Sequence, residues 1–595
     1  MVKRLKLTFV TAALALIATA LLPSNALAYS PAYTFYGAGS SAMFNNFALV
    51  AGINNTWPGN NSVCGQHRWS RKYAAGAHGA QLVDSRSASI LPEGANIWVV
   101  WDDDFVNQVA GSGHLCAYLS VDSIVGNRAF FANATIHMVS PANDTDGAFI
   151  AGFTPTENLP AAVITALEGK KINVAMTDIR PEDAKFATIR ALTGYGLRIP
   201  RYLHTGLGYG VGAPPPGNVV GTPIYSSQSS TQANPVDFAI DPSDADPFTG
   251  ATPRNYLVWS IGASPVMVVI NTSNTAAGHL GDGSYTNIGH EALAYALNGT
   301  YTHIRQLSNT AYVDFSGTIH SPEANVPLNV FQREPLSGTF NTMEFCVTLT
   351  RAQYPTYEGP STYGQETGVV PANQSHCTVG PCYGVGLENG NPFNHIATNG
   401  AIRARAIGTG EMVTAVAGHA DSLGYSFWGF SNFAGKTGIK YMTVDGVDPL
   451  FATPTDNTQG AYTFPYCTGA SYAPPCPAIP FTHIDDGTYP IWSVLRAVYD
   501  PSDSTLILPA LINYAQHAAV YTYADFVPAT SLTVFRSHYN QIVVTSNSND
   551  ATPNNGYKTG TKETGGDVGG AVMTIQSELD YIADTGGSQQ VNIFN

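Results

Sequence analysis

The strongest constraint on the fold is an alternation of short apolar segments with helical patterns. Residues 33–36, 97–101, 117–121 and 172–176 form apolar or alternating runs bounded by turn residues, which is typical of strands. Apolar residues recur with helical spacing at 40–50 and 157–168, and Pro181 opens a third helical pattern at 181–191. Strands that alternate with helices predict an α/β fold, in which helices cover a sheet.

The alternation resumes after a long interruption. Residues 203–253 contain three consecutive prolines and several Asp-Pro turns, and they predict a surface insertion; the Pro-, Gly- and Cys-rich residues 354–392 predict a second. Further strands are expected at 256–270 and 328–332, and a helix at 291–297. Helices are also expected at 411–417, 492–498 and 568–582.

The first residues have the pattern of a secretory leader. Three basic residues precede an apolar run at 7–22, and Ala26-Leu27-Ala28 supplies the small residues that signal peptidase accepts. We therefore expect a signal peptide at 1–28, cleaved after Ala28, and a periplasmic or extracellular protein. All seven cysteines follow this leader, where disulfides are favoured, but their pairing and the odd thiol are not readable from sequence.

Charge and motifs exclude several classes of function. The formal net charge is −15 and no basic stripe occurs, so nucleic acid is not expected as a partner. No Cys-x-x-Cys pair, Gly-x-Ser-x-Gly elbow, His-Glu-x-x-His or Walker loop occurs, so we expect no metal site, no cofactor and no enzyme activity. The acidic run at 102–104 could hold a cation. Residues 143–147 have some likeness to a calcium loop, but the bidentate glutamate is missing, so a solvated turn is the simpler interpretation there.

Three segments share one layout, in which a strand is followed by small or polar residues and then by the start of a helix. They are Gly37-Ala38-Gly39-Ser40-Ser41, Thr177-Asp178, and Arg333 with Ser337-Gly338-Thr339. A helix N-terminus presents unpaired N–H groups and a partial positive charge, so it attracts anions. Hydroxyls add donors, and an arginine offers a bidentate fork. Taken singly, each serine is most often a helix cap and the arginine a surface ion pair.

As an ordered set, these segments resemble the phosphate-binding proteins of ABC phosphate transporters, a type of periplasmic two-lobed substrate-binding protein. Gly37 to Ser41 resemble that family's Gly-Ala-Gly loop, and Thr177-Asp178 its Ser-Asp segment. Arg333 stands four residues before Ser-Gly-Thr, as in the family, although Pro335 replaces the usual acidic residue. The family's second serine loop has no clear counterpart, and residues 84–89 are the nearest polar segment.

The resemblance implies a periplasmic binding protein-like α/β fold of two lobes with a hinge and large loop insertions. It implies lobe I at 29–271, with the insertion at about 203–253, lobe II at 272–488, and a return to lobe I with C-terminal helices at 489–595. The expected ligand is phosphate or another small oxyanion, delivered to the membrane subunits of an ABC permease. The alternative is an extracellular structural or surface-adhesion protein that reuses the fold.

The resemblance also implies a role for each candidate residue. Ser40 and Ser41 would donate from the first helix start, and Ser337, Gly338 and Thr339 from the second lobe. Arg333 would be the charge partner of the anion. Asp178 would accept a hydrogen bond from a protonated oxyanion and repel sulfate, which has no proton to give.

Overall fold

The computed structural model describes a set of separate ranges of the chain. They are residues 31–52, 63–72, 96–131, 135–136, 138–139, 157–179, 256–297, 299, 301–307, 312–313, 319–320, 326–333, 337–347, 395–396, 400–406, 408–467, 477–521, 525–536, 572–574 and 591–592. The expected signal peptide, the helix expected at 181–191, the serine-loop candidate at 84–89 and the insertions at 203–253 and 354–392 lie outside the described residues.

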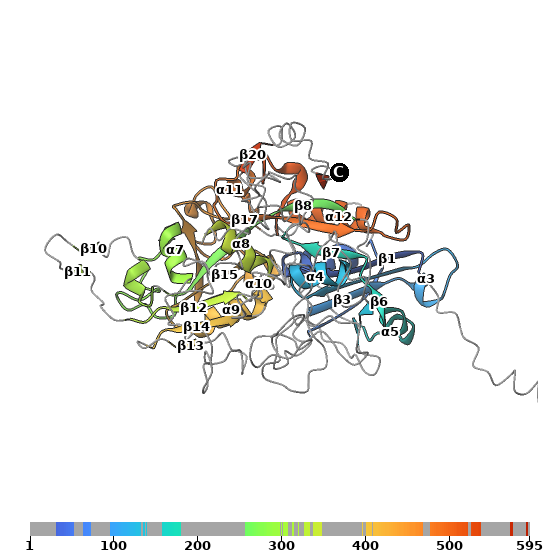
Figure 1. The fold of residues 1–595 in the computed structure, drawn as a ribbon, viewed down its shortest axis with the longest axis horizontal. Helices are drawn as coiled ribbons and strands as arrows, with labels where there is room; N and C mark the ends of the chain where they lie inside the picture. Colours follow the sequence, from blue (N-terminus) through green and yellow to red (C-terminus); the bar gives the residue numbers. More distant parts are fainter. Residues whose placement is uncertain are drawn as a thin grey trace, which may run out of the picture.

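The chain folds into two α/β halves that share one mixed sheet (Figure 1). Its main path runs β13-β14-β12-β15-β8-β17-β7-β1-β4-β3-β2. The two central strands, β8 (Leu257–Asn271) and β17 (Trp492–Tyr499), run antiparallel and connect the halves. We call the part on the β7 side the first half and the part on the β15 side the second half.

In the first half, β1 is parallel to both β4 and β7, so their carboxyl ends meet at one edge. The strands of this half are β1 (Tyr33–Gly39), β2 (His67–Lys72), β3 (Asn96–Trp101), β4 (His114–Ser120) and β7 (Val174–Thr177), with a small pair β5 (Thr135–Ile136) and β6 (Lys170–Lys171). Its helices are η1 (Ser41–Met43), α2 (Phe44–Gly52), α3 (Asp103–Val106), α4 (Ser123–Phe131) and α5 (Ala161–Leu167).

In the second half, β12 is likewise parallel to β14 and β15. Its strands are β9 (Asn287–Ile288), β12 (Asn329–Arg333), β13 (His395–Ile396), β14 (Ile402–Ala406), β15 (Ser422–Phe427) and β16 (Ile439–Val444), with a separate pair β10 (Tyr312–Val313) and β11 (Ile319–His320). Its helices are α7 (His290–Leu297), η5 (Ile304–Leu307), α8 (Gly338–Cys346), α9 (Gly408–Gly418), α10 (Phe430–Phe433) and η6 (Pro454–Asp456).

The remaining elements follow the second half in sequence. They are α11 (Thr482–Asp485), α12 (Leu508–Tyr521), β18 (Val527–Pro528), η8 (Ala529–Ser531), β19 (Val534–Arg536), β20 (Val572–Thr574) and β21 (Val591–Asn592). Helix α12 packs on α2 of the first half, and β18 and β21 pair with β8. The expected lobe boundaries remain predictions, because β8 pairs with strands of both halves.

The long strand β8 changes partner in its middle. Residues Leu257–Pro265 pair with β17, and Val266–Ile270 pair with β15. A proline has no N–H for a ladder hydrogen bond, and Pro265 stands where one partner strand ends and the other begins. The apolar core runs through this crossing without a break, since buried residues of both halves belong to one cluster that contains Met176, Val266 and Tyr425.

Two helices expected from sequence are wrong. Residues 492–498 form strand β17, which pairs with β7 on one side and β8 on the other, and every residue from Trp492 to Val498 is buried. A continuous apolar run buried on both faces does not distinguish strand from helix by periodicity. Within the helix expected at 568–582, Val572–Thr574 form strand β20, paired with β19. The helices expected at 40–50, 157–168, 291–297 and 411–417 are confirmed, with shifted ends.

Cys64, which lies just before β2 and whose N–H donates to the carbonyl of Ala51 in α2 (3.0 Å), forms a disulfide with Cys116 of β4. Cys467 is also disulfide-bonded, and Cys346 is a buried thiol. The other three cysteines lie outside the described residues. The short spacing of Cys467 and Cys476 in the sequence favours a local disulfide loop, and this pairing is a prediction.

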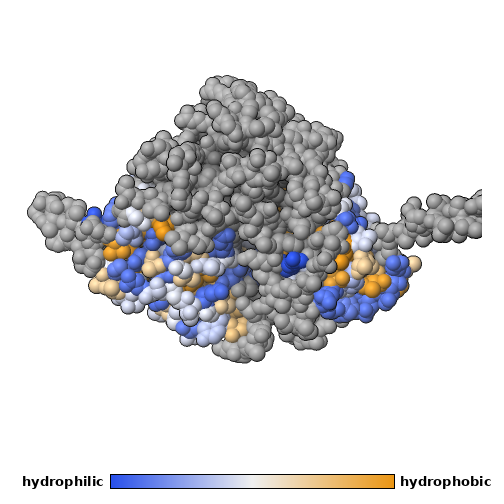
Figure 2. All heavy atoms as spheres, turned by 90° about the horizontal axis from the view of Figure 1, so that it is seen from below, coloured by the Kyte–Doolittle hydropathy of each residue, from blue (hydrophilic) through white to orange (hydrophobic). Residues whose placement is uncertain are grey.

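The described surface carries few large apolar side chains. On the face in Figure 2, hydrophilic, intermediate and hydrophobic side chains are intermixed over the described parts of both halves. Across the described ranges, only Tyr33, Val109 and Tyr466 are exposed large hydrophobic residues. No described helix is both long and apolar enough to cross a bilayer.

Candidate functional site

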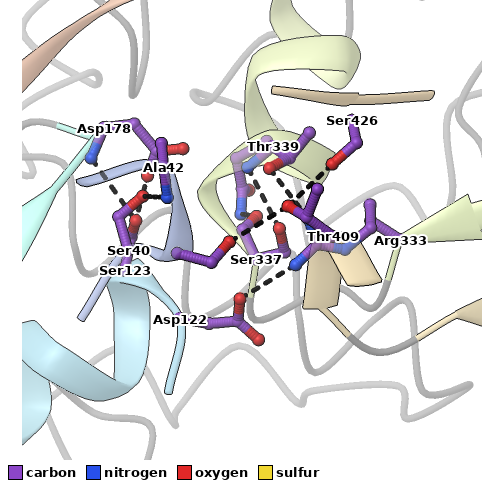
Figure 3. A network of polar contacts seen from close by, with 12 residues as sticks. Ser40, Ala42, Asp122, Ser123, Asp178, Arg333, Ser337, Thr339, Thr409 and Ser426 are labelled. Atoms are coloured by element: carbon purple, nitrogen blue, oxygen red, sulfur yellow. Dashed lines mark hydrogen bonds and ion pairs between the residues drawn. The ribbon is translucent and has the colours of Figure 1, made fainter. Parts of the chain in front are cut away.

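Junctions between strands and helices from both halves meet at one place (Figure 3). The first half contributes the residues after β1, β4 and β7, because the ends of parallel strands share an edge. The second half contributes the end of β12 and the starts of α8 and α9. These junctions carry Ser40, Ser41, Asp122, Ser123, Asp178, Arg333, Ser337, Gly338, Thr339 and Thr409.

The first junction is held by backbone contacts around Ser40. Its N–H donates to the carbonyl of Met176 (2.7 Å), and its hydroxyl oxygen caps the N–H of Ala42 (3.3 Å). Gly39 before it has φ +140°, and a Cβ there would overlap the carbonyl of Met176. The glycine is therefore required for this close approach of β1 to β7. Because the amide of Ser40 already has an acceptor, only its hydroxyl proton remains to be donated.

The carboxylate of Asp178 lies between the two halves. It accepts a hydrogen bond from the hydroxyl of Ser123 at the start of α4. A Cβ added at Gly338, the first residue of α8, would overlap this carboxylate. The carboxylate therefore abuts the N-terminal end of α8, where a helix attracts negative charge.

Burial sets the acidity of Asp178, whose residue is 1% exposed. Loss of water raises the pKa of Asp178 to about 6, although the bond from Ser123 and the charges of Arg333 and Arg496 oppose the rise. Its backbone carbonyl accepts from Ser493 (2.6 Å) and from the Arg496 guanidinium (3.4 Å), so strand β17 fixes its position. Asp178 can thus act as a hydrogen-bond acceptor at neutral pH.

The guanidinium of Arg333 is fully buried at the end of β12. Its Nη1 donates to Thr339 Oγ1 (3.1 Å), and its Nη2 donates to Asp122 Oδ1 of the first half (3.0 Å). Ser337 caps α8 by accepting from the N–H of Thr339 (3.1 Å). Arg333 and the start of α8 therefore form one region of positive potential. Carboxylates of the first half face this region.

A chain of hydroxyls also bridges the halves. Ser426 donates to Thr409 Oγ1 (2.8 Å), which lies 3.2 Å from the hydroxyl of Ser41. Since Thr409 accepts from Ser426, its own proton can be donated to Ser41. The bridge joins α9 to the first helix start.

The structure brings all seven sequence-predicted residues, from Ser40 to Thr339, into this one region. Sequence reasoning missed Asp122, Ser123 and Thr409. Asp122 and Ser123 follow a correctly predicted strand and lie where helix α4 begins, which is the same layout as the other three segments. This layout was the sequence signal by which Asp122 and Ser123 could have been identified as site residues.

The acidic run at 102–104 has a structural role. Asp102 caps α3 through the N–H of Phe105 (2.8 Å) and pairs with His114 (2.6 Å). Across the described ranges, no group of three or more His, Cys, Asp or Glu side chains could hold a metal ion.

Comparison with known proteins gives structural similarity only. No protein-family model matches the chain, and no curated protein matches it by sequence. A protein from Clostridium perfringens solved with bound phosphate aligns at 13% identity and TM-score 0.22, over 44% of this chain and 65% of that one, slightly under two thirds. An ABC-type phosphate transport receptor from Vibrio cholerae aligns at 13% identity and TM-score 0.22, over 45% and 68%.

A phosphate-binding protein from Stenotrophomonas maltophilia aligns over more of the chain. The alignment covers 75% of this chain and 83% of that one, at 13% identity and TM-score 0.29. These values describe a distant similarity, so the function has to be argued from the site itself.

Proposed function

We propose that the protein is an exported substrate-binding protein that holds phosphate or a related small oxyanion between its halves and passes it to an ABC permease. The observation that carries this proposal is the meeting of a buried arginine, a capped helix start and several hydroxyls with a buried carboxylate. Positive potential favours an anion, and the carboxylate favours one that brings a proton.

Ligand entry requires the two halves to separate, because their polar groups contact one another directly. A ligand that binds both halves would favour the closed arrangement, as in hinge closure. Asp178 would accept a hydrogen bond from monohydrogen phosphate or arsenate. Sulfate has no proton to donate to that buried carboxylate, and a missing hydrogen bond of this kind costs about 1–3 kcal/mol or more.

A second candidate is an extracellular structural or adhesion protein that keeps the fold without the ligand. It is favoured by the fact that Arg333 and Asp178 already have partners within the protein. The two candidates differ in whether an anion can replace those partners.

Isothermal titration at neutral pH with phosphate, arsenate and sulfate tests the proposal. We expect phosphate and arsenate to bind and sulfate to bind weakly or not at all. Asp178→Asn should admit sulfate, and Arg333→Gln should remove binding. Arg305→Gln in η5 removes the same charge away from the site and serves as the matched control. Absence of heat with all three anions would support the structural candidate instead.

A further inference from the structure

The arginine of the candidate site already forms an ion pair with a carboxylate of the protein itself. Asp122 is 5% exposed and Arg333 is fully buried, and their charged atoms lie 3.0 Å apart. The two residues come from different halves and are 211 positions apart in the chain. An anion that reaches Arg333 therefore meets a group of its own sign in the same place.

The backbone at Asp122 has an unusual conformation that hydrogen bonds hold in place. Asp122 has φ +84°, in the left-handed region that side-chain-bearing residues seldom adopt. Its N–H donates to the carbonyl of Gly39 (3.0 Å), and its carbonyl accepts from Gly126 (2.9 Å). Such conformations persist where the surroundings impose them, and they concentrate at functional sites.

We infer that Asp122 is a specificity-determining residue of the site, an inference that rests on the proposed function. Asp122 neutralises Arg333 through the ion pair between the two halves. A ligand must displace it, so oxyanions bind less tightly than the arginine and helix start alone would allow. After displacement, Asp122 and Asp178 both face the ligand. The site therefore favours an oxyanion with two hydroxyl donors, such as dihydrogen phosphate, over monohydrogen phosphate, which can donate to only one of the two carboxylates.

Titration of Asp122→Asn with inorganic phosphate and with sulfate tests this inference. We expect phosphate to bind about tenfold tighter or more than to wild type, because a close opposing charge has been removed. Sulfate affinity should rise by at least as much. Asp104→Asn, an exposed carboxylate of the same half, should leave both affinities unchanged.

The outcomes separate this inference from the proposed function. If wild type binds phosphate and Asp122→Asn binds it no tighter, Asp122 is not a competitor, while the proposed function stands. If wild type shows no phosphate binding and Asp122→Asn does bind phosphate, the Asp122 carboxylate outcompetes phosphate for Arg333, which supports the inference. If neither protein binds any oxyanion, both ideas are wrong.

Loss of the Asp122 charge leaves Arg333 buried without its carboxylate, so the variant could fail to fold. In that case phosphate should restore folding, measured by circular dichroism and by the thermal midpoint, because a bound anion replaces the missing charge. Asp122→Glu keeps the charge and should retain wild-type phosphate affinity. If phosphate raises the midpoint of Asp122→Asn no more than that of wild type, the inference is overturned.

Discussion

The two halves bring opposite chemistry to their shared site. The first half contributes buried carboxylates, Asp122 and Asp178, at the starts of helices or ends of strands. The second half contributes Arg333, the start of α8 and the hydroxyl of Thr409. Buried in the closed arrangement, these charges would be costly without the groups that face them from the other half. The groups suited to bind a ligand are therefore the same groups that hold the two halves together.

Of the changes considered, removal of the Arg333 charge should have the largest effect on the pairing between the halves. Arg333→Gln leaves Asp122 buried without its partner, and breaking a buried ion pair typically costs about 3–5 kcal/mol. We expect a free energy of unfolding lower by about that amount, measured by urea denaturation. Arg305→Gln should change it little. An equal decrease in the free energy of unfolding of the two variants would show that the ion pair between the halves does not stabilise the fold.

The pH dependence of stability should report the buried Asp178. Its folded pKa of about 6 exceeds the ordinary 3.8, so the native state holds the extra proton in this window. The free energy of unfolding should therefore fall as pH rises from about 4 to about 6, by about 3 kcal/mol at most. Asp178→Asn should remove this part of the slope.

Asp525 provides the comparison outside the site. It is buried near β8, accepts from the N–H of Phe430 (2.6 Å), and burial raises its pKa to about 7. Asp525→Asn should therefore remove a slope that extends to about pH 7. Saturating phosphate should change the Asp178 slope and leave the Asp525 slope in place. A phosphate effect on both would argue against local binding.

A methyl group on the helix start should separate the halves. Gly338→Ala forces a Cβ into the Asp178 carboxylate, and overpacking of this kind costs about 1–3 kcal/mol. Phosphate binding should weaken as well. Gly410→Ala in the first turn of α9 meets nothing within 4 Å, and it should stabilise by about 0.5–1 kcal/mol. Thermal unfolding and titration of both variants check the contrast.

The hydroxyl bridge should have the smallest effect. Thr409→Val removes the link between Ser426 and Ser41 and should cost about 1 kcal/mol of unfolding free energy. Thr414→Val, on the exposed side of the same helix, loses only a bond to the Gly410 carbonyl (2.8 Å). A larger loss at Thr414 than at Thr409 would contradict a role for the bridge.

Local patterns were enough for much of the fold and part of the site. The strands that end near Ser40, Asp178 and Arg333 were predictable from apolar runs and turn residues. Strand β17 was not, because burial on both faces hides the alternation that marks a strand. The segment after β4 was overlooked, although it has the same layout as the others.

From the chain alone one can therefore assign the α/β class, the helix starts and the residue types that attract an anion, since these depend on neighbours along the backbone. Only the tertiary structure decided that Asp122 faces Arg333 and that Asp178 abuts Gly338. These pairs join distant segments, and their geometry depends on how β8 and β17 set the two halves against each other. Neither pairing can be predicted from residues that are neighbours in the sequence, because each joins segments that are far apart along the chain.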